Sequence, residues 1–280
     1  MSLLQAAAVG LSVAINDNAC SEMRNIAPMH AIPVSAVMIC GQPGQTLETS
    51  LASLARFDEV LVYLNGDSDA SAAVCAQYAN VTAIVGSFVG FGPTKQAAVE
   101  AARHDWVFCI DSDEHPDPAL VAAIADIDFD GAQRAFNVLR KNRFMGQHVR
   151  RGGWGNDVLL RVFHRGHARF NDNAVHEKVI AESGNAILLD GALWHEAVTQ
   201  LDQFLQKISR YSELAANAGQ GKPGSHPAFA LLRAHFAFFR SYILQLGFLA
   251  GWRGIVIAQS RAVGTFYRYA KRYTKSRHFE

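Results

Sequence analysis

Asp105-Trp-Val-Phe-Cys-Ile-Asp-Ser-Asp-Glu-His-Pro116 begins with an apolar run and ends in a cluster of carboxylates. Residues 106–110 have the length and composition of a buried strand. The carboxylates that follow it belong to Asp111, Asp113 and Glu114. Such groups repel one another unless a cation joins them, and hard oxygen ligands suit Mg²⁺ or Mn²⁺. The alternative is a solvated turn that caps a helix starting near Pro118, because acidic residues favour helix N-termini.

Strand and helix patterns also alternate on the N-terminal side of this segment. The predicted strands are residues 34–40, 59–64, 81–85 and 106–110, and the predicted helices are residues 46–56, 70–79 and 93–103. Consecutive βα units predict a parallel sheet with both faces covered by helices. Ligands of such sheets bind at the carboxyl ends of the strands, so we expect the chemistry to follow Cys40, Leu64, Val85 and Ile110.

Composition excludes several classes of protein. The chain has 280 residues, half of them apolar, which is enough to bury a core, and its net charge of +1 gives no general field for nucleic acid. Residues 261–280 hold six Lys and Arg against Glu280, a net charge of +5, and the remaining 20 basic and 24 acidic residues give −4. The four cysteines have no CxxC spacing, which argues against a disulfide framework or a zinc ribbon.

The N-terminal segment, residues 1–32, is expected to be a poorly ordered leader. It has no Lys or Arg before Arg24 and therefore lacks the charged start of a secretory signal. A membrane-spanning helix needs roughly 18–20 apolar residues. The best candidate, residues 241–258, is interrupted by Arg253, so we expect no spanning helix.

The C-terminal third changes character. Apolar residues recur there at steps of three and four, namely Phe229, Leu232, Phe236, Phe239, Ile243 and Leu246. This spacing predicts an amphipathic helix. Cations lie among these residues, and aromatic residues with cations suit the headgroup boundary of an anionic membrane. The alternative is a helical hairpin with its aromatic residues in the core; we expect part of the face to pack and part to bind membrane.

Two groups of motifs follow one another along the chain. The first group is Gly90-Phe-Gly-Pro-Thr-Lys95-Gln-Ala-Ala, Asp105-Trp106 and Asp111-Ser-Asp113-Glu114. The second group is Gly153-Trp154, Asp157, Arg161, Val175-His176-Glu177 and the helix predicted over residues 201–217. Together they resemble family 2 glycosyltransferases of the GT-A fold, in particular the branch of lipopolysaccharide-core β-1,4-glucosyltransferases, over roughly residues 33–270.

The resemblance implies an α/β fold with a GT-A-like, mostly parallel sheet flanked by helices and a helical C-terminal extension. The catalytic domain would be residues 33–198, with a donor half at 33–128 and an acceptor half at 129–198. Residues 199–280 would form the amphipathic extension with its basic tail.

The resemblance also implies a donor site. A divalent cation, Mg²⁺ or Mn²⁺, on Asp113 with Asp111 nearby would neutralise the charge of the leaving diphosphate, and His195 would complete the metal ligands. Lys95 stands at the family's basic position, where it could reach phosphate or the acidic cluster. The alternatives are a surface lysine for Lys95 and a hydrogen-bonded core histidine for His195.

On the acceptor side, the resemblance implies an inverting transfer in which a base takes the proton of the attacking hydroxyl. Glu177 is the first candidate for this base and Asp157 the second; the alternative for each is an ion pair with a nearby arginine. The acceptor-binding candidates are Trp154, Arg161 and His176. A cationic stretch at residues 134–151 could hold an anionic acceptor or could protect a sheet edge.

Two departures from the family pattern lie on the nucleotide side. Gln42-Pro43-Gly44 stands where the family usually shows Asn-Glu-Glu, and Leu64 stands where it carries an Asp that bonds the base. We expect Asn65 or Asp67 to supply that hydrogen bond instead.

The predicted function is the inverting transfer of a hexose, glucose in this branch, from a UDP-linked nucleotide sugar to a saccharide or glycolipid acceptor. The acceptor would be lipopolysaccharide core or a related cell-surface glycan. The predicted location is the cytoplasmic face of the inner membrane, as a peripheral protein. The departures at Leu64 and residues 42–44 motivate an alternative, a degenerate nucleotide- or glycan-binding protein without catalysis. A sugar nucleotidyltransferase would need a glycine-rich basic loop after the first strand, which this sequence lacks.

Overall fold

A computed structural model describes residues 31–41, 46–66, 69–131, 133–155, 157–173, 177–181, 186–217 and 226–277. Most of the predicted leader lies outside these residues. Ile32, which the sequence analysis assigned to the leader, is instead the first residue of a strand and is 1% exposed. The catalytic fold therefore begins at Ile32 rather than after it.

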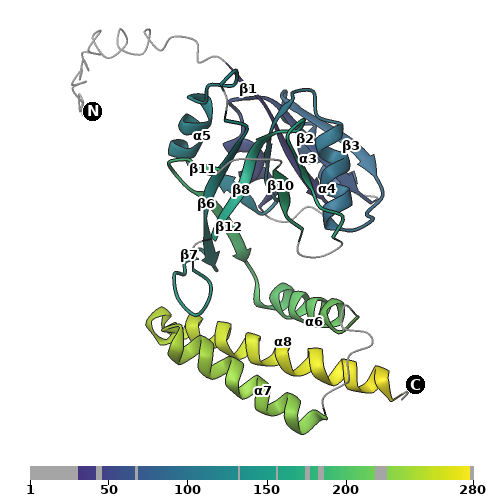
Figure 1. Cartoon of the computed structure of the whole chain (residues 1–280), viewed down its shortest axis with the longest axis vertical. Helices are drawn as coiled ribbons and strands as arrows, with labels where there is room; N and C mark the ends of the chain where they lie inside the picture. The colour runs from purple at the N-terminus through teal and green to yellow at the C-terminus, as the bar shows by residue number, and fades with distance from the viewer. Residues whose placement is uncertain are drawn as a thin grey trace, which may run out of the picture. The chain divides into compact units, whose positions relative to one another are not determined.

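The N-terminal half of the fold is a parallel sheet with connecting helices (Figure 1). Its strands are β1 (Ile32–Cys40), β2 (Phe57–Asn65), β3 (Val81–Gly86) and β4 (Trp106–Cys109), in the order β3-β2-β1-β4. The connecting helices are α2 (Leu47–Ser53), α3 (Asp69–Cys75) and α4 (Phe91–Glu100). Every neighbouring pair of these strands is parallel, which confirms the arrangement predicted for this half.

Strand β1 shows why this sheet is buried on both faces. Val34, Ala36 and Met38 pack into one core cluster, and Val37 and Ile39 pack into a second. Successive side chains of a strand point to opposite faces, so the apolar run supplies both cores at once.

The second half of the sheet adds antiparallel pairs. β8 (Asp157–His164) runs antiparallel to both β4 and β6 (Ala135–Phe144), and β12 (Leu193–Val198) continues the sheet beside β6. Shorter strands complete the set: β5 (Glu114–Pro116), β7 (Gln147–His148), β9 (Ala168–Phe170), β10 (Val179–Ala181) and β11 (Ile187–Leu188). The predicted α/β fold with a mostly parallel sheet is confirmed, and the antiparallel pairs lie in its second half.

Helix α5 (Pro118–Ala125) tests the capping alternative for the acidic cluster. Its N-cap is Asp117, whose Oδ1 accepts a hydrogen bond from the Leu120 amide at 2.9 Å. Glu114 is fully buried in the sheet. The interpretation of residues 111–114 as a solvated helix cap is therefore wrong.

The C-terminal part is helical, as predicted. It consists of α6 (Leu201–Asn217), α7 (Pro227–Phe239), a π-helical turn η1 (Arg240–Leu244), a short 3₁₀ segment η2 (Gly247–Ala250) and α8 (Trp252–Ser276). α7 and α8 lie side by side as a hairpin (Figure 1). α8 is also fixed to α6, because Lys271 Nζ donates to the Ser209 carbonyl at 3.0 Å.

The hairpin is joined to the sheet through backbone groups. Ser241 Oγ donates to the Gly152 carbonyl at 2.8 Å, and Arg253 Nε donates to the Phe144 carbonyl at 3.1 Å. Phe144, Trp154 and Phe204 form an aromatic cluster at the same junction. None of the helices in the described part of the chain has the length and apolar content needed to cross a bilayer.

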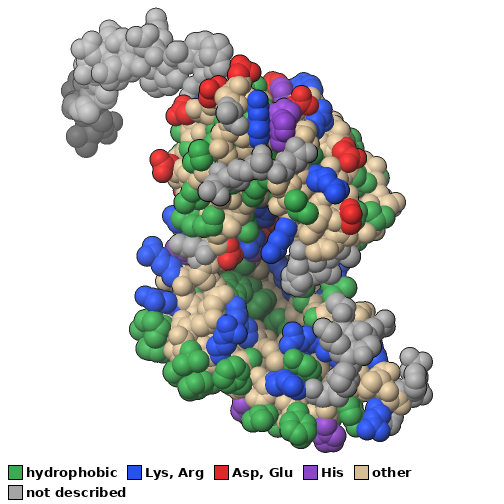
Figure 2. Space-filling view, in the orientation of Figure 1, with side chains coloured by type: hydrophobic (Ala, Val, Ile, Leu, Met, Phe, Trp, Pro, Cys, Tyr) green, Lys and Arg blue, Asp and Glu red, His purple; other side chains and the backbone are tan. Residues whose placement is uncertain are grey.

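The apolar face predicted for the C-terminal third is exposed. Its residues Phe229, Leu232, Phe236, Phe239, Ile243 and Leu246 are between 37% and 67% exposed. Figure 2 shows hydrophobic side chains gathered on the surface of this hairpin. The alternative that these aromatic residues pack in the core is wrong; small residues such as Ala230, Ala234 and Ala258 are buried there instead.

Candidate active site

A cleft of about 820 Å³ lies at the carboxyl ends of the parallel strands. Gly41 follows β1, Asn65 ends β2 and Asp111 follows β4, and all three line the cleft. Further lining comes from Lys95, Asp113, Glu177 and His195 and from helix α6. Residues far apart in the sequence thus meet where the topology of an open parallel sheet places ligands.

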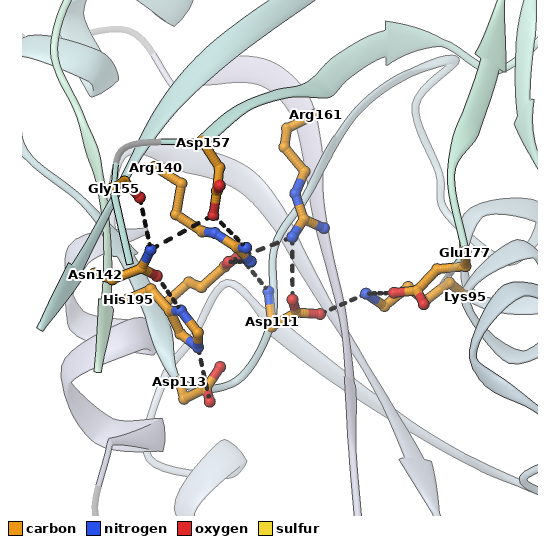
Figure 3. A network of polar contacts seen from close by, with 11 residues as sticks. Lys95, Asp111, Asp113, Arg140, Asn142, Gly155, Asp157, Arg161, Glu177 and His195 are labelled. Carbon is orange, nitrogen blue, oxygen red and sulfur yellow. Dashed lines mark hydrogen bonds and ion pairs between the residues drawn. The ribbon is translucent and has the colours of Figure 1, made fainter. Parts of the chain in front are cut away.

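Lys95 joins two carboxylates in this cleft (Figure 3). Its Nζ lies 2.6 Å from Asp111 Oδ1 and 2.7 Å from Glu177 Oε1. Burial alone would lower the pKa of Lys95, but the charges of Asp111 and Glu177 raise it above its usual value. Lys95 is 5% exposed, so the alternative of a surface lysine is wrong.

A close backbone approach positions the helix that carries Lys95. The Gly92 amide donates to the Asn173 carbonyl at 3.0 Å, and a Cβ at Gly92 would overlap the carbonyls of Asn171 and Asn173. Gly90 precedes α4 with φ of 116°, a value that favours glycine. The two glycines of the motif therefore dock α4 against the segment that leads to Glu177.

Arg161, on β8, holds the other side of Asp111. Its Nη2 lies 3.0 Å from Asp111 Oδ2 and 3.3 Å from Glu114 Oε1. Burial alone would raise the pKa of Asp111, but the charges of Lys95 and Arg161 hold that pKa well below its usual range. Arg161 is 7% exposed and is engaged with these two carboxylates, and its contact with an acceptor stays a prediction.

Glu114 and Arg140 extend the network toward Asp157. Glu114 Oε1 accepts from Arg140 Nη1 at 3.1 Å, and Arg140 Nη2 lies 2.8 Å from Asp157 Oδ2. The alternative to a catalytic role for Asp157 and Glu177 was an ion pair with a nearby arginine. Asp157 forms such a pair with Arg140, whereas Glu177 pairs with Lys95.

Asp113 and His195 form a second cluster, and Asn142 orients the histidine (Figure 3). Asn142 Nδ2 donates to the Gly155 carbonyl at 3.2 Å, which leaves Asn142 Oδ1 to accept from His195 Nδ1 at 2.7 Å. His195 Nε2 then faces Asp113 Oδ2 at 3.3 Å. Burial alone would raise the pKa of Asp113, but the contact with His195 keeps that pKa below its usual value.

This pair fits a divalent cation. Because Nδ1 keeps its hydrogen for Asn142, Nε2 can either donate a proton to Asp113 Oδ2 or share a metal ion with that oxygen. Carboxylate and imidazole suit Mn²⁺, and Mg²⁺ commonly keeps few protein ligands with several waters. In the described ranges, no three His, Cys, Asp or Glu side chains are arranged to share a metal, so the predicted set of Asp111, Asp113 and His195 is not assembled as one site.

Two adjacent residues at the end of β2, Leu64 and Asn65, differ in whether they reach the cleft. Leu64 is 2% exposed and packs in the core, whereas Asn65 lines the cleft. Asn65 Oδ1 is buried and has no hydrogen-bond partner among the described residues. The predictions for Asp67, His176 and residues 42–44 lie outside the described residues.

Comparison with known proteins agrees with this geometry. Residues 35–194 match glycosyl transferase family 2. This chain belongs to glycosyl transferase family 2. A lipopolysaccharide core biosynthesis glycosyltransferase, LpsC of Rhizobium meliloti (strain 1021), is 26% identical over 252 residues, which cover 87% of this chain and 93% of the relative. An uncharacterized glycosyltransferase of Rickettsia prowazekii (strain Madrid E) is also 26% identical, over 76% of this chain and 77% of the relative.

Solved structures are more distant from this family 2 chain. TarS residues 1–349 of S. aureus align with 14% identity and a TM-score of 0.41 over 88% of this chain and 92% of TarS. Glucosyl-3-phosphoglycerate synthase of Mycobacterium tuberculosis, in complex with Mn²⁺, UDP and phosphoglyceric acid, aligns with 20% identity and a TM-score of 0.30 over 40% of this chain and 43% of that one.

Helix α6, predicted from the sequence as part of the C-terminal extension, also lines the cleft. Its cleft-lining residues are Gln203, Phe204, Gln206, Lys207, Arg210, Tyr211 and Leu214. The helical spacing of 203, 207, 210 and 214 was visible in the sequence as one face. The main cleft of this glycosyltransferase therefore includes a wall from beyond residue 198.

Most cations of the stretch at residues 134–151 contact groups outside the main cleft. Arg143 pairs with Glu196 at 2.9 Å and stacks on Trp194, and Arg134 donates to the Phe129 carbonyl. Among the described residues of this stretch, Arg140 alone lines the main cleft. Trp154 lies on a smaller cavity beside Asp157.

Proposed function

We propose that this family 2 glycosyltransferase moves a hexose from a nucleotide sugar to a saccharide acceptor with inversion, using Glu177 as the base. The observation that carries the proposal is that Asn65, Lys95, Asp111, Asp113 and Glu177 line one cleft at the strand ends. The name of the relative LpsC supports lipopolysaccharide core, or a related glycan, as the acceptor. Glucose as the sugar and UDP as the nucleotide are carried over from the resemblance of the motifs.

Asn65 is our candidate for binding the nucleotide. Its Oδ1 is a buried acceptor without a partner among the described residues, and leaving such an atom unpaired costs about 1–3 kcal/mol. A nucleobase N–H would satisfy it. Asn65 would then replace the Asp that the family usually has at the position of Leu64.

Asp113 and His195 would hold a divalent cation, Mg²⁺ or Mn²⁺. When bound, the ion would neutralise the charge that develops on the leaving diphosphate. Asn142 keeps His195 Nε2 directed at the site, which is the role of partners that orient metal ligands. Lys95 and Arg161 keep Asp111 ionised at the edge of the same cleft.

Glu177 is preferred to Asp157 as the base because of its position. Glu177 lines the main cleft together with Asp113, whereas Asp157 does not line that cleft. Each carboxylate has a cationic partner, Lys95 for Glu177 and Arg140 for Asp157, so ion pairing does not separate the two candidates. A Glu177 carboxylate oxygen would take the proton of the acceptor hydroxyl as that oxygen attacks the anomeric carbon from the side opposite the diphosphate.

The exposed face of the α7–α8 hairpin supports peripheral attachment to an anionic membrane, on the cytoplasmic side of the inner membrane. Residues 226–277 contain nine Lys and Arg and no Asp or Glu. Each cation near an anionic leaflet contributes about 1 kcal/mol of attraction, and the apolar side chains add burial in the interface. The same excess of positive charge would repel a second copy of this face, which favours lipid as its partner.

The test of the proposed function is hydrolysis of a panel of sugar nucleotides with and without Mg²⁺ or Mn²⁺. We expect slow, metal-dependent hydrolysis of one donor, lost in Asp113→Ala. A protein that binds none of the donors would refute the transferase and support the degenerate alternative.

A further inference from the structure

A smaller cavity of about 240 Å³ adjoins the main cleft. Its lining comes from β6, β8, β12, α6 and α8 and includes Asn142, Trp154, Asp157 and Arg261. The two cavities share His195, Ala197, Phe204 and Lys207. A molecule held in the small cavity would therefore border directly on the cleft that contains Asp113 and Glu177.

The small cavity carries uncompensated positive charge. Asp157 is paired with Arg140 at 2.8 Å. Neither Lys207 nor Arg261 forms an ion pair with a carboxylate of the described ranges, although Asp113 is close enough to feel the charge of Lys207. Burial, and then the neighbouring charge of Arg240, lower the pKa of Arg261. Two cations without acid partners attract an anion.

The position of Arg261 depends on a glycine. Its Nη2 donates to the Gly153 carbonyl at 2.6 Å. Gly153 has φ of 76°, and a Cβ there would overlap the guanidinium of Arg261. The Gly-Trp motif thus lets Arg261 reach the loop that carries Trp154, and both side chains line the small cavity.

The remaining lining suits a sugar. Trp154 is half-buried and is held by a tilted contact with Phe144 and an edge contact with Phe204, so its ring is fixed in place. Asn142 and Asp157 provide polar side chains at the same cavity. Ligand sites commonly combine an apolar surface with a few placed polar groups.

We propose that the small cavity is an acceptor subsite for a sugar that carries a phosphate or carboxylate, with Lys207 and Arg261 contacting the anionic group. A guanidinium recognises either anion in a bidentate manner, and an ammonium adds a point charge. The proposal rests on the proposed transferase function. The donor does not occupy this cavity, because Asn65, Lys95, Asp111 and Asp113 line the main cleft and not the small one.

The test measures binding of small sugars to the full chain in the presence of UDP and Mg²⁺ by saturation-transfer NMR. The probes are glucose 6-phosphate, glucuronate, neutral methyl glucoside and inorganic phosphate. We expect one or both anionic sugars to bind at least about tenfold more tightly than methyl glucoside and inorganic phosphate. The two anionic arms show whether phosphate or carboxylate is preferred.

Lys207→Gln and Arg261→Gln should each reduce this preference by about tenfold. Arg261→Gln also removes the bond to Gly153, so Lys207→Gln, which changes an exposed side chain, is the decisive variant. Arg277→Gln removes one positive charge at the far end of α8 and should leave the preference unchanged.

The proposal would be overturned by no binding of either anionic sugar, by equal binding of neutral and anionic sugars, or by an unchanged preference in Lys207→Gln. Inorganic phosphate that binds as tightly as the sugars would also overturn it, since the cavity would then bind an anion without its sugar. Binding of UDP and of sugar nucleotides is measured in parallel. If they bind but anionic sugars do not, this inference fails alone; if no sugar nucleotide binds, the proposed function fails.

Discussion

Replacing Lys95 by Met should destabilise the protein far more than breaking an ion pair of similar length on its surface. Met removes the charge and keeps a long, helix-compatible side chain. The Lys95 side chain is 6% exposed and its partners Asp111 and Glu177 are 29% and 19% exposed. Removing one partner of a buried ion pair costs about 3–5 kcal/mol. Arg161 still compensates Asp111, so we expect the free energy of unfolding to fall by about 3 kcal/mol.

The matched control is Arg103→Met. Arg103 and Asp58 lie 2.7 Å apart, but their side chains are 59% and 43% exposed. Exposed pairs contribute about 0–1 kcal/mol. The assay is urea unfolding of both variants in the presence of EDTA, with the free energy of unfolding taken from the midpoints at constant slope. A loss in Lys95→Met as small as that in Arg103→Met would refute the view that Lys95 holds the two carboxylates together.

The difference in the free energy of unfolding between wild type and Lys95→Met depends on pH with a defined sign. Burial alone would raise the pKa of Asp111, but Lys95 and Arg161 depress it in the folded state. Its contribution is therefore present above the unfolded pKa of about 3.9 and is lost as the pH falls through the folded pKa. The pKa of Lys95 is raised, so its contribution is complete below about 10.4 and is lost as the pH rises through its folded pKa. The difference between wild type and Lys95→Met should be constant between about pH 5 and pH 9.

Three further predictions concern catalysis and attachment. Glu177→Gln should reduce transfer by at least about 10³-fold and leave UDP binding within twofold, whereas retained turnover would remove Glu177 as the base. His195→Ala should raise the concentration of Mn²⁺ needed for half-maximal donor hydrolysis by at least about tenfold, because one of two protein ligands is lost; an unchanged requirement would exclude His195 as a ligand. The double change Leu232→Ser and Phe236→Ser should weaken binding to vesicles with anionic lipid by at least about tenfold in a sedimentation assay. Val85→Ser, at a 77% exposed position on β3, is the control, and equal vesicle binding by both proteins would contradict membrane attachment.

The donor half of the fold could be predicted because its signals are local. Each apolar run in β1 to β4 is short and is followed by a helical pattern, so the order of elements fixes a parallel sheet without knowledge of distant contacts. The carboxylates at residues 111 and 113 follow from the same logic, since the end of a parallel strand is where ligands bind. Helix boundaries were less accurate: α4 begins at Phe91 rather than at Pro93, because Gly90 ends the preceding loop.

Contacts between distant elements could not be predicted. Arg161 was an acceptor candidate by its place in a motif, yet its partners Asp111 and Glu114 lie about 50 residues earlier, and they become neighbours because β8 pairs with β4. Asn142 was not singled out, since nothing in a strand sequence shows that its amide will face His195. The helix over residues 201–217 was predicted as part of the C-terminal extension, since nothing in its own sequence shows that it lies against the ends of the strands and lines the cleft.

The distribution of charge around the cleft differs between its floor and its helical wall. Four carboxylates alternate with three cations in the ion-pair network of the cleft, which leaves a net charge of −1. In order, the network consists of Glu177, Lys95, Asp111, Arg161, Glu114, Arg140 and Asp157. Asp113 adds a further negative charge where the cation would bind. The described part of α7 and α8 contains cations and no carboxylates, and α6 contributes Lys207 and Arg210 to the cleft. An acidic floor favours a metal ion with its diphosphate, and a basic helical wall favours an anionic acceptor, so the opposite charges would draw donor and acceptor to different sides of the same cleft.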